Sequence, residues 1–141
     1  AVDAELSVAG LGPMSTAVHN ATQMGWLDGP ELLNALSRAR ALLFPSRWQE
    51  PFGILAVEAL AQGTPVIAMV QGGMVDWADA GVLTIAPGDV QEMAQAIKTL
   101  HTQPTRAAQL GADGWQMVGE RYAPGPLKAA LWAIYTATAQ P

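Results

Sequence analysis

The chain of 141 residues contains no cysteine and few charged residues, and both shortages narrow the range of possible proteins. Without cysteine, a small scaffold held together by disulfides is excluded. Only 13% of the residues are Asp, Glu, Lys or Arg, about half the usual share of roughly 25%. Disordered chains are charged and poor in aliphatic residues, whereas half of this chain is hydrophobic. We therefore expect a folded domain that is a piece of something larger, with part of its surface covered.

The chain also lacks a basic surface and a long apolar segment. Its seven basic and twelve acidic residues give a net charge of −5, so we expect no nucleic-acid partner, which would require a basic stripe. No apolar run approaches the roughly 20 residues of a membrane span, so we expect no transmembrane segment. The beginning of the chain has no basic region and no signal-like core, and we expect a cytoplasmic location.

Residues that usually hold metals or act as nucleophiles are scarce as well. The two histidines, His19 and His101, have no partner at the spacing of metal ligands. The chain has neither a cysteine nucleophile nor a Gly-x-Ser-x-Gly elbow. We therefore expect no metal site and no bound cofactor.

Glycine and proline divide the sequence into short apolar strands and amphipathic helices. Asp28 and Glu31 have the spacing of a capping box at the start of the first helix, and Gly63 suits the end of the second helix. Apolar stripes on two later helices predict core positions, although the second stripe also fits docking onto an absent domain. The stripes are Met93, Ala94, Ile97 and Leu100, and Leu127, Leu131, Ile134 and Tyr135. The expected strands cover residues 5–10, 22–25, 41–45, 65–70 and 82–85. The first expected helix starts at residue 28, and the later ones cover residues 53–62, 89–101, 105–120 and 124–138.

This alternation of strands and helices is typical of βαβ units. We expect an α/β fold, a Rossmann-like parallel sheet with helices on both faces. No boundary divides the chain, so residues 1–141 form a single domain in this prediction. Ligands of such folds bind at the carboxyl ends of the strands. The segments at that rim are 10–13, 25–28, 46–53 and 71–76.

The rim segment around residues 46–53 is the most informative. A buried strand ends at Pro45, and we expect the next helix to begin between Pro51 and Gly53, because proline suits a first helical turn. The backbone N–H groups of Phe52, Gly53 and Ile54 would then point outward, an arrangement that binds phosphate. An ordinary βα connection that binds nothing is the alternative.

Two carboxylates accompany this helix start. Glu50 lies in the loop immediately before the helix, and Glu58 lies about one turn further along the same helix. Carboxylates at such positions accept hydrogen bonds from vicinal hydroxyls, as acidic residues do from ribose. Because glutamate early in a helix is favourable without any ligand, the spacing alone leaves both interpretations open.

Longer stretches of the chain follow a recognisable pattern. Two of them read Pro45-Ser-Arg-Trp-Gln-Glu50-Pro-Phe-Gly-Ile54 and Glu58-Ala-Leu-Ala-Gln-Gly63-Thr-Pro-Val-Ile-Ala68. Together with Gly72-Gly73, Gly81-Val-Leu, Ala86-Pro-Gly-Asp89, Val8-Ala-Gly-Leu-Gly-Pro13 and Met24-Gly-Trp-Leu27, they cover nearly the whole chain to about Tyr122. This pattern resembles the C-terminal, donor-binding domain of family 4 retaining glycosyltransferases, which have the GT-B fold.

The resemblance implies one half of a GT-B architecture, without the first strand-loop of the domain and without the N-terminal acceptor domain of the same protein. It implies that the intact enzyme transfers a hexose, with retention, from a UDP- or GDP-linked donor to an acceptor hydroxyl. The isolated chain would bind a nucleoside diphosphate weakly and catalyse no transfer. The alternative is a non-catalytic nucleotide or nucleotide-sugar binding module or subunit.

The resemblance also implies roles for individual residues. Glu50 is the expected catalytic residue beside the anomeric centre, as a nucleophile, a charge stabiliser or a sugar clamp; we favour the last two roles. Glu58 would accept hydrogen bonds from the ribose. The remaining donor-binding residues are Phe52, Gly53 and Ile54 for the sugar and distal phosphate, Trp26, Leu27 and Asp28 for the base, and Gly72 and Gly73 for the rim. The family often has Glu where this chain has Asp76, and its Arg and Lys for the diphosphate have no counterpart before Glu5.

Overall fold

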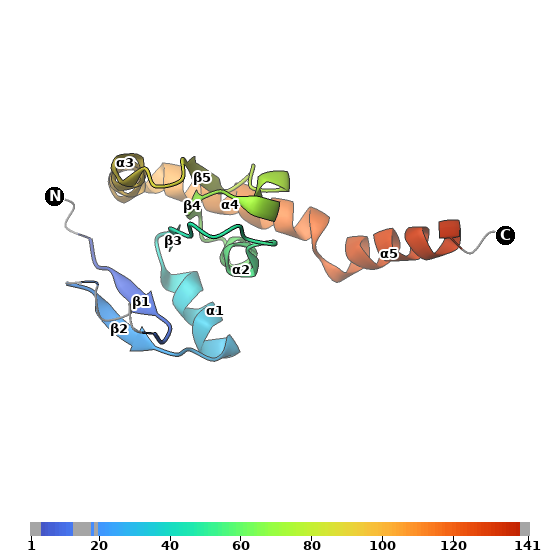
Figure 1. Ribbon diagram of the computed structural model, residues 1–141, viewed down its shortest axis with the longest axis horizontal. Helices are drawn as coiled ribbons and strands as arrows, with labels where there is room; N and C mark the ends of the chain where they lie inside the picture. The colour runs from blue at the N-terminus through green and yellow to red at the C-terminus, as the bar shows by residue number, and fades with distance from the viewer. Residues whose placement is uncertain (1–3, 13–17, 19, 139–141) are drawn as a thin grey trace.

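The structure, a computed structural model, describes residues 4–12, 18 and 20–138, and it alternates parallel strands with helices (Figure 1). The strands are β1 (Ser7–Ala9), β2 (Thr22–Gly25), β3 (Leu42–Phe44), β4 (Val66–Met69) and β5 (Val82–Ile85). The helices are α1 (Gly29–Arg38), α2 (Ile54–Ala61), the 3-10 helix η2 (Gly72–Asp76), α3 (Val90–Thr102), α4 (Pro104–Arg121) and α5 (Pro124–Thr138).

The core is built around β4, the central strand of the three-stranded parallel sheet β3-β4-β5. All four residues of β4 are buried, and successive side chains of a strand point to opposite faces. Val66 and Ala68 pack with residues of α1 and α2, whereas Ile67 and Met69 pack with residues of α3. Helices therefore cover both faces of this sheet, as the α/β prediction requires.

The other two strands, β1 and β2, form a separate parallel sheet. Within the described ranges, no ladder joins it to β3-β4-β5. Three of the four residues of β2 are exposed, so this strand contributes little to the core. The α/β class and the parallel pairing are confirmed, but the strands form two hydrogen-bonded sheets where we expected one.

Helix α4 ties the two sides of the sheet together. Ala107 near its start packs in the α3 cluster, and Met117 near its end packs in the α2 cluster. Between them, Gly111 and Gly114 approach so closely that an added Cβ would overlap the Gly63 carbonyl oxygen and lie 2.5 Å from Leu60 Cδ2, respectively. The close approach of α4 holds the end of α2 in place.

The apolar stripes of the later helices were predicted with mixed success. In α3, Leu100 is buried and Met93 and Ile97 are half-buried, but Ala94 is exposed and Ala96 takes its place in the core. The 3.6-residue period brings Ala96, rather than Ala94, onto the face with Met93 and Leu100.

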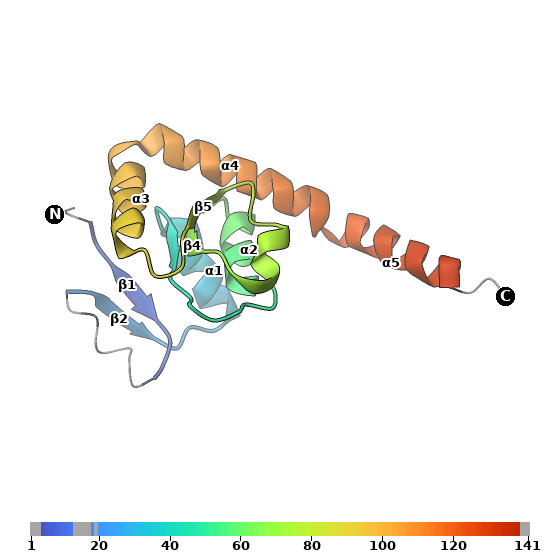
Figure 2. The same ribbon diagram turned by 45° about the horizontal axis from the view of Figure 1, so that its top comes forward.

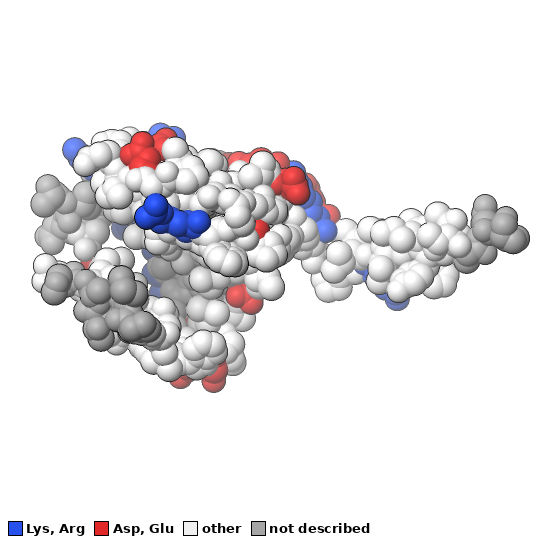
Figure 3. Space-filling model, in the orientation of Figure 1, with Lys and Arg blue, Asp and Glu red and all other residues white. Residues whose placement is uncertain are grey.

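The stripe of α5 does not lie in the core, and its core prediction is wrong. Leu127, Leu131, Ile134 and Tyr135 are 53–63% exposed, and α5 contains no buried residue. The helix extends away from the rest of the molecule (Figure 2). Its visible surface is almost free of charge (Figure 3), since Lys128 is the one charged residue in the helix. None of the helices in the described ranges is long and apolar enough to span a membrane.

Candidate functional site

The site begins at the start of α2, where Gly53 is the residue preceding the first helical turn. Gly53 has φ 81° and ψ 50°, a left-handed conformation that glycine adopts without steric cost. The sharp turn at Gly53 delays the helix to Ile54, so Pro51 lies in the loop before it. The prediction that Pro51 belongs to the first helical turn is therefore wrong, whereas the helical range to Ala61 agrees with the prediction.

The backbone at this helix start has unpaired donors. The Gly53 carbonyl accepts hydrogen bonds from the N–H groups of Ala56 and Val57, at 3.0 and 3.3 Å. In the part of the chain that the structure describes, the N–H groups of Phe52, Gly53 and Ile54 have no acceptor, and no side chain caps the helix. Gly53 is buried, and buried backbone donors almost always have a partner. The start of α2 thus offers its N–H groups to an acceptor that is not part of the described chain.

The carboxylate of Glu50 is held in a defined position beside this helix start. Its Oε1 accepts a hydrogen bond from the hydroxyl of Ser46 at 2.8 Å, and the residue is half-buried. The amide of Gln71 donates to the Ser46 carbonyl oxygen at 3.3 Å, and the amide of Gln49 donates to the Gln71 side-chain oxygen at 3.3 Å. The Ser46 bond engages one carboxylate oxygen of Glu50 and leaves the other for a ligand, and the two glutamine bonds support the loop that carries Ser46.

The Gly72-Gly73 turn packs directly against the loop that carries Glu50. The N–H of Gly73 donates to the Glu50 carbonyl oxygen at 2.7 Å. A Cβ at Gly72 would overlap the Glu50 carbonyl oxygen, and a Cβ at Gly73 would overlap that of Pro51. The absence of side chains at both positions allows η2 to support the loop, so the structure brings these two glycines together with Glu50.

The Phe52 side chain anchors the same loop from within. Its ring lies 5.8 Å from the Trp77 ring and meets Tyr122 edge to face at 5.4 Å. The Trp77 indole N–H donates to the Phe52 carbonyl oxygen at 2.8 Å. Ser46, Trp77 and Tyr122 were given no role from the sequence. Of these three, Ser46 could have been found from the sequence, because it stands four residues before Glu50 in the motif.

The remaining predicted residues lie on α2 and in the β2–α1 connection. Glu58 is half-buried and four residues after Ile54, so the two share one face of α2. Trp26 is 75% exposed and Leu27 is half-buried in the β2–α1 connection. Asp28 accepts a hydrogen bond from the Glu31 N–H at 3.0 Å and so caps α1.

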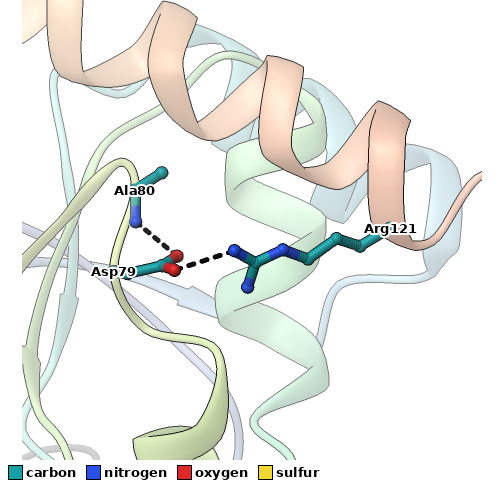
Figure 4. Close-up of polar contacts among 3 residues, drawn as sticks. All are labelled: Asp79, Ala80 and Arg121. Carbon is teal, nitrogen blue, oxygen red and sulfur yellow. Dashed lines mark hydrogen bonds and ion pairs between the residues drawn. The ribbon is translucent and has the colours of Figure 1, made fainter.

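One ion pair supports the far side of the site. Arg121, at the end of α4, donates to an Asp79 carboxylate oxygen at 2.8 Å, and the Ala80 N–H donates to the other at 2.7 Å (Figure 4). The hydrogen bond from Arg121, with that from Ala80, holds the pKa of Asp79 below its usual value. The pair fixes the end of α4 next to Tyr122, whose ring contacts Phe52.

No group of His, Asp and Glu residues in the described ranges could hold a metal ion. His19 and Pro13, two residues named from the sequence, lie outside those ranges. The cations expected to neutralise a diphosphate have no counterpart at the start of α2. The backbone N–H groups at the start of α2, with the carboxylates of Glu50 and Glu58, have a chemistry that suits a ligand with both phosphate and hydroxyl groups.

A family comparison identifies the chain. The family described as "Glycosyl transferases group 1" matches residues 16–117, which include the Glu50 loop, α2 and the Gly72-Gly73 turn but not Arg121 or Tyr122. The chain belongs to the group 1 glycosyl transferases. The loop and glycine turn described above are thus the central part of a group 1 glycosyl transferase domain.

Known relatives support this membership. The chain is 40% identical over 86 residues to a glycogen synthase of Mycobacterium tuberculosis, covering 60% of this chain and 20% of the relative. It is 28% identical over 143 residues to a GDP-mannose-dependent monoacylated alpha-(1-6)-phosphatidylinositol monomannoside mannosyltransferase of Corynebacterium glutamicum, covering 84% of this chain and 38% of the relative.

A solved structure supports the fold. The Anabaena protein HepE, solved in complex with UDP and glucose, superposes with a TM-score of 0.79 at 18% identity, covering 96% of this chain and 41% of that one. This likeness confirms the predicted α/β fold of the GT-B kind. The chain spans between a fifth and two fifths of the length of these three proteins.

Proposed function

We propose that this chain is the donor-binding domain of a retaining, family 4 glycosyltransferase, placed C-terminal to an acceptor-binding domain of the same protein. The intact enzyme transfers a hexose from a UDP- or GDP-linked donor to an acceptor hydroxyl. The observation that carries the proposal is the uncapped start of α2, with N–H groups that lack acceptors in the described structure beside the ordered Glu50. Family membership and a structural neighbour solved with UDP support it.

The start of α2 suits the departure of a nucleoside diphosphate. Negative charge builds up on the distal phosphate as the bond to the sugar breaks, and preorganised N–H donors stabilise such charge. The N–H groups of Gly53 and Ile54, with the helix dipole behind them, supply this stabilisation. An Arg and a Lys from another part of the protein complete the neutralisation, and no metal or cofactor is needed in this proposal.

The carboxylate of Glu50 has a separate task at the sugar. Its Oε1 is held by Ser46, which leaves Oε2 to accept a hydrogen bond from a hexose hydroxyl or to stabilise positive charge at the anomeric carbon. The Gly73 N–H holds the backbone carbonyl of Glu50 and the Ser46 hydroxyl holds its carboxylate, so the carboxylate is positioned before the donor binds. Preorganised polar groups of this kind lower the barrier without further rearrangement.

The nucleoside part of the donor would lie along α2 and the β2–α1 connection. Glu58, one turn after Ile54 on the same face, accepts hydrogen bonds from the ribose hydroxyls in this proposal. The exposed Trp26 side chain, with Leu27 and Asp28, borders the base. Relatives whose names and complexes include GDP-mannose and UDP leave both bases as candidates, and the titrations below distinguish them.

Calorimetric titration of the protein in its natural full length tests this proposal. We expect either UDP or GDP to bind, and Glu58→Gln to raise the dissociation constant about tenfold, because the amide has one acceptor oxygen in place of two and lacks the charge that strengthens the hydrogen bonds. Glu120→Gln, at an exposed position on α4, is the matched control and should leave the affinity unchanged.

The outcomes separate the alternatives. Absence of binding by both nucleotides would contradict the proposal, and an unchanged affinity of Glu58→Gln would remove Glu58 from the ribose. Nucleotide binding without transfer to any acceptor would favour a non-catalytic binding module. If transfer occurs, the anomeric configuration of the product, read by NMR, tests retention.

A further inference from the structure

Trp77 is a buried aromatic residue whose polar atom is aimed at the candidate site. It follows η2, is 3% exposed, and packs in the same cluster as residues of α2 and β4. Its one polar side-chain atom, Nε1, donates a hydrogen bond of 2.8 Å to the Phe52 carbonyl oxygen. This bond joins η2 to the peptide unit immediately before Gly53.

The direction of that carbonyl determines the direction of the next N–H group. In a trans peptide the C=O and the following N–H point to opposite sides, and the chain has no cis peptide within its described residues. Because the Phe52 carbonyl points toward Trp77 in the core, the Gly53 N–H points to the side away from Trp77. That N–H has no acceptor among the described residues, although Gly53 is buried.

The peptide orientation is not fixed by the backbone alone. Glycine adopts positive and negative φ about equally readily, so the peptide between Phe52 and Gly53 is free to flip as far as sterics at Gly53 are concerned. A flipped peptide would present the carbonyl oxygen to a phosphate instead of the N–H. The hydrogen bond from Trp77 exists in only one of these two orientations and therefore selects it.

The surroundings of Trp77 keep its indole in place. The backbone N–H of Trp77 donates to the Met74 carbonyl oxygen at 3.2 Å, and the Met74 side chain lies where a Cβ on Gly53 would be, with contacts of 3.0 Å. The Phe52 ring contacts the rings of both Trp77 and Tyr122. The peptide, the glycine and the preceding side chain are thus held by the buried residues Trp77 and Met74 and by the half-buried Tyr122.

We infer that Trp77 is a positioning residue of this site: its indole N–H orients the Phe52–Gly53 peptide so that the Gly53 N–H faces the distal phosphate of the nucleotide. This inference rests on the function proposed above. It assigns to Trp77 a role in the affinity for the distal phosphate that is separate from its role in the core.

The test compares nucleotides that differ by one phosphate, UDP with UMP and GDP with GMP, on the protein in its natural full length. Trp77→Phe removes the N–H donor and keeps an aromatic ring. We expect the dissociation constant of the diphosphate to rise about 3- to 10-fold, as for the loss of one neutral hydrogen bond, while that of the monophosphate stays the same. Trp115→Phe, at a 63% exposed position on α4, is the matched control and should change neither value.

A role in packing alone would raise the dissociation constants of diphosphate and monophosphate by the same factor, and equal factors or no change would overturn the inference. If Trp77→Phe does not fold, 3-benzothienylalanine at position 77 has the ring shape of tryptophan but sulfur instead of N–H, and the same expectation applies. Failure of the unmodified protein to bind any of the four nucleotides would instead overturn the proposed function and this inference with it. Selective loss of diphosphate affinity supports both.

Discussion

The helices α1 and α2 both follow parallel strands, but their N-termini are built in opposite ways. At α1, Asp28 accepts from the Glu31 N–H while Glu31 accepts from the Asp28 N–H, each at 3.0 Å. At α2, the corresponding residue is Gly53, which has no side chain and provides no cap. The first helix has side-chain caps for the N–H groups of Asp28 and Glu31, whereas the second has no side-chain cap and leaves its first N–H groups available.

This difference shows how one fold separates structural helices from a ligand-binding helix. A capping side chain typically stabilises a helix by about 1 kcal/mol, and α2 forgoes this contribution. In its place, the loop before α2 is held by hydrogen bonds from residues outside the loop: the Gly73 N–H donates to the Glu50 carbonyl oxygen and the Trp77 indole N–H to that of Phe52. The loop is therefore ordered without the donors of the helix being used.

Closing the start of α2 with a negative charge should have the largest effect. In Gly53→Asp a carboxylate would be added at the residue before the first turn of α2, next to the N–H groups expected to bind the phosphate, and we expect the affinity for the nucleoside diphosphate to fall more than about 100-fold through charge repulsion. Gly53→Ala adds the contact with Met74 and the backbone strain without the charge, so its loss should be clearly smaller. Equal losses in the two variants, measured by calorimetry, would show that strain rather than charge is responsible.

Removing the cap of α1 should have a smaller effect, and it should change the stability of the fold. In Asp28→Ala the Glu31 N–H loses its acceptor, so the free energy of unfolding should fall by about 1 kcal/mol. Asp28→Asn retains a capping oxygen and serves as the control, with most of the stability preserved. Urea denaturation followed by circular dichroism measures both variants. A loss in Asp28→Asn as large as that in Asp28→Ala would contradict the capping role.

Removing the ion pair between Asp79 and Arg121 should have the smallest effect on stability, and this effect should depend on pH. Because the folded pKa of Asp79 is lowered, its pairing with Arg121 contributes stability above the unfolded pKa of about 3.9 and loses it as the pH falls through the folded pKa. Thermal unfolding of Asp79→Asn should therefore show a slightly lower midpoint than the unmodified protein at pH 7. This difference should disappear in strong acid, and a difference that grows with acidity would contradict the assignment.

Local patterns in the sequence predicted most of the elements. The strand at Thr22–Gly25 and the capping box of Asp28 and Glu31 are formed as expected, because both depend on residues close together in the chain. The segment with the last apolar stripe is helical in α5, as expected, but the spacing of its apolar residues indicates only that one face of the helix is apolar. It does not indicate which partner covers that face, and in the described structure none does.

The parts of the site that the sequence did not predict depend on contacts between distant segments. The bond from Trp77 to the Phe52 carbonyl joins residues 25 positions apart, and the support of Gly53 by Met74 depends on how η2 folds back onto the loop. Glu50, Gly72 and Gly73 were named through a resemblance. Their close approach is physically explained by the missing side chains of the two glycines.

The most direct test of the central claim is a crystal structure of the natural full-length protein with whichever of UDP and GDP binds more tightly. The account predicts a distal phosphate oxygen within about 2.7–3.2 Å of the backbone nitrogen of Gly53 or Ile54, with the Asp28 cap of α1 unchanged. A diphosphate bound away from α2, with both of these N–H groups facing water, would contradict the claim that the open start of α2 is the donor site.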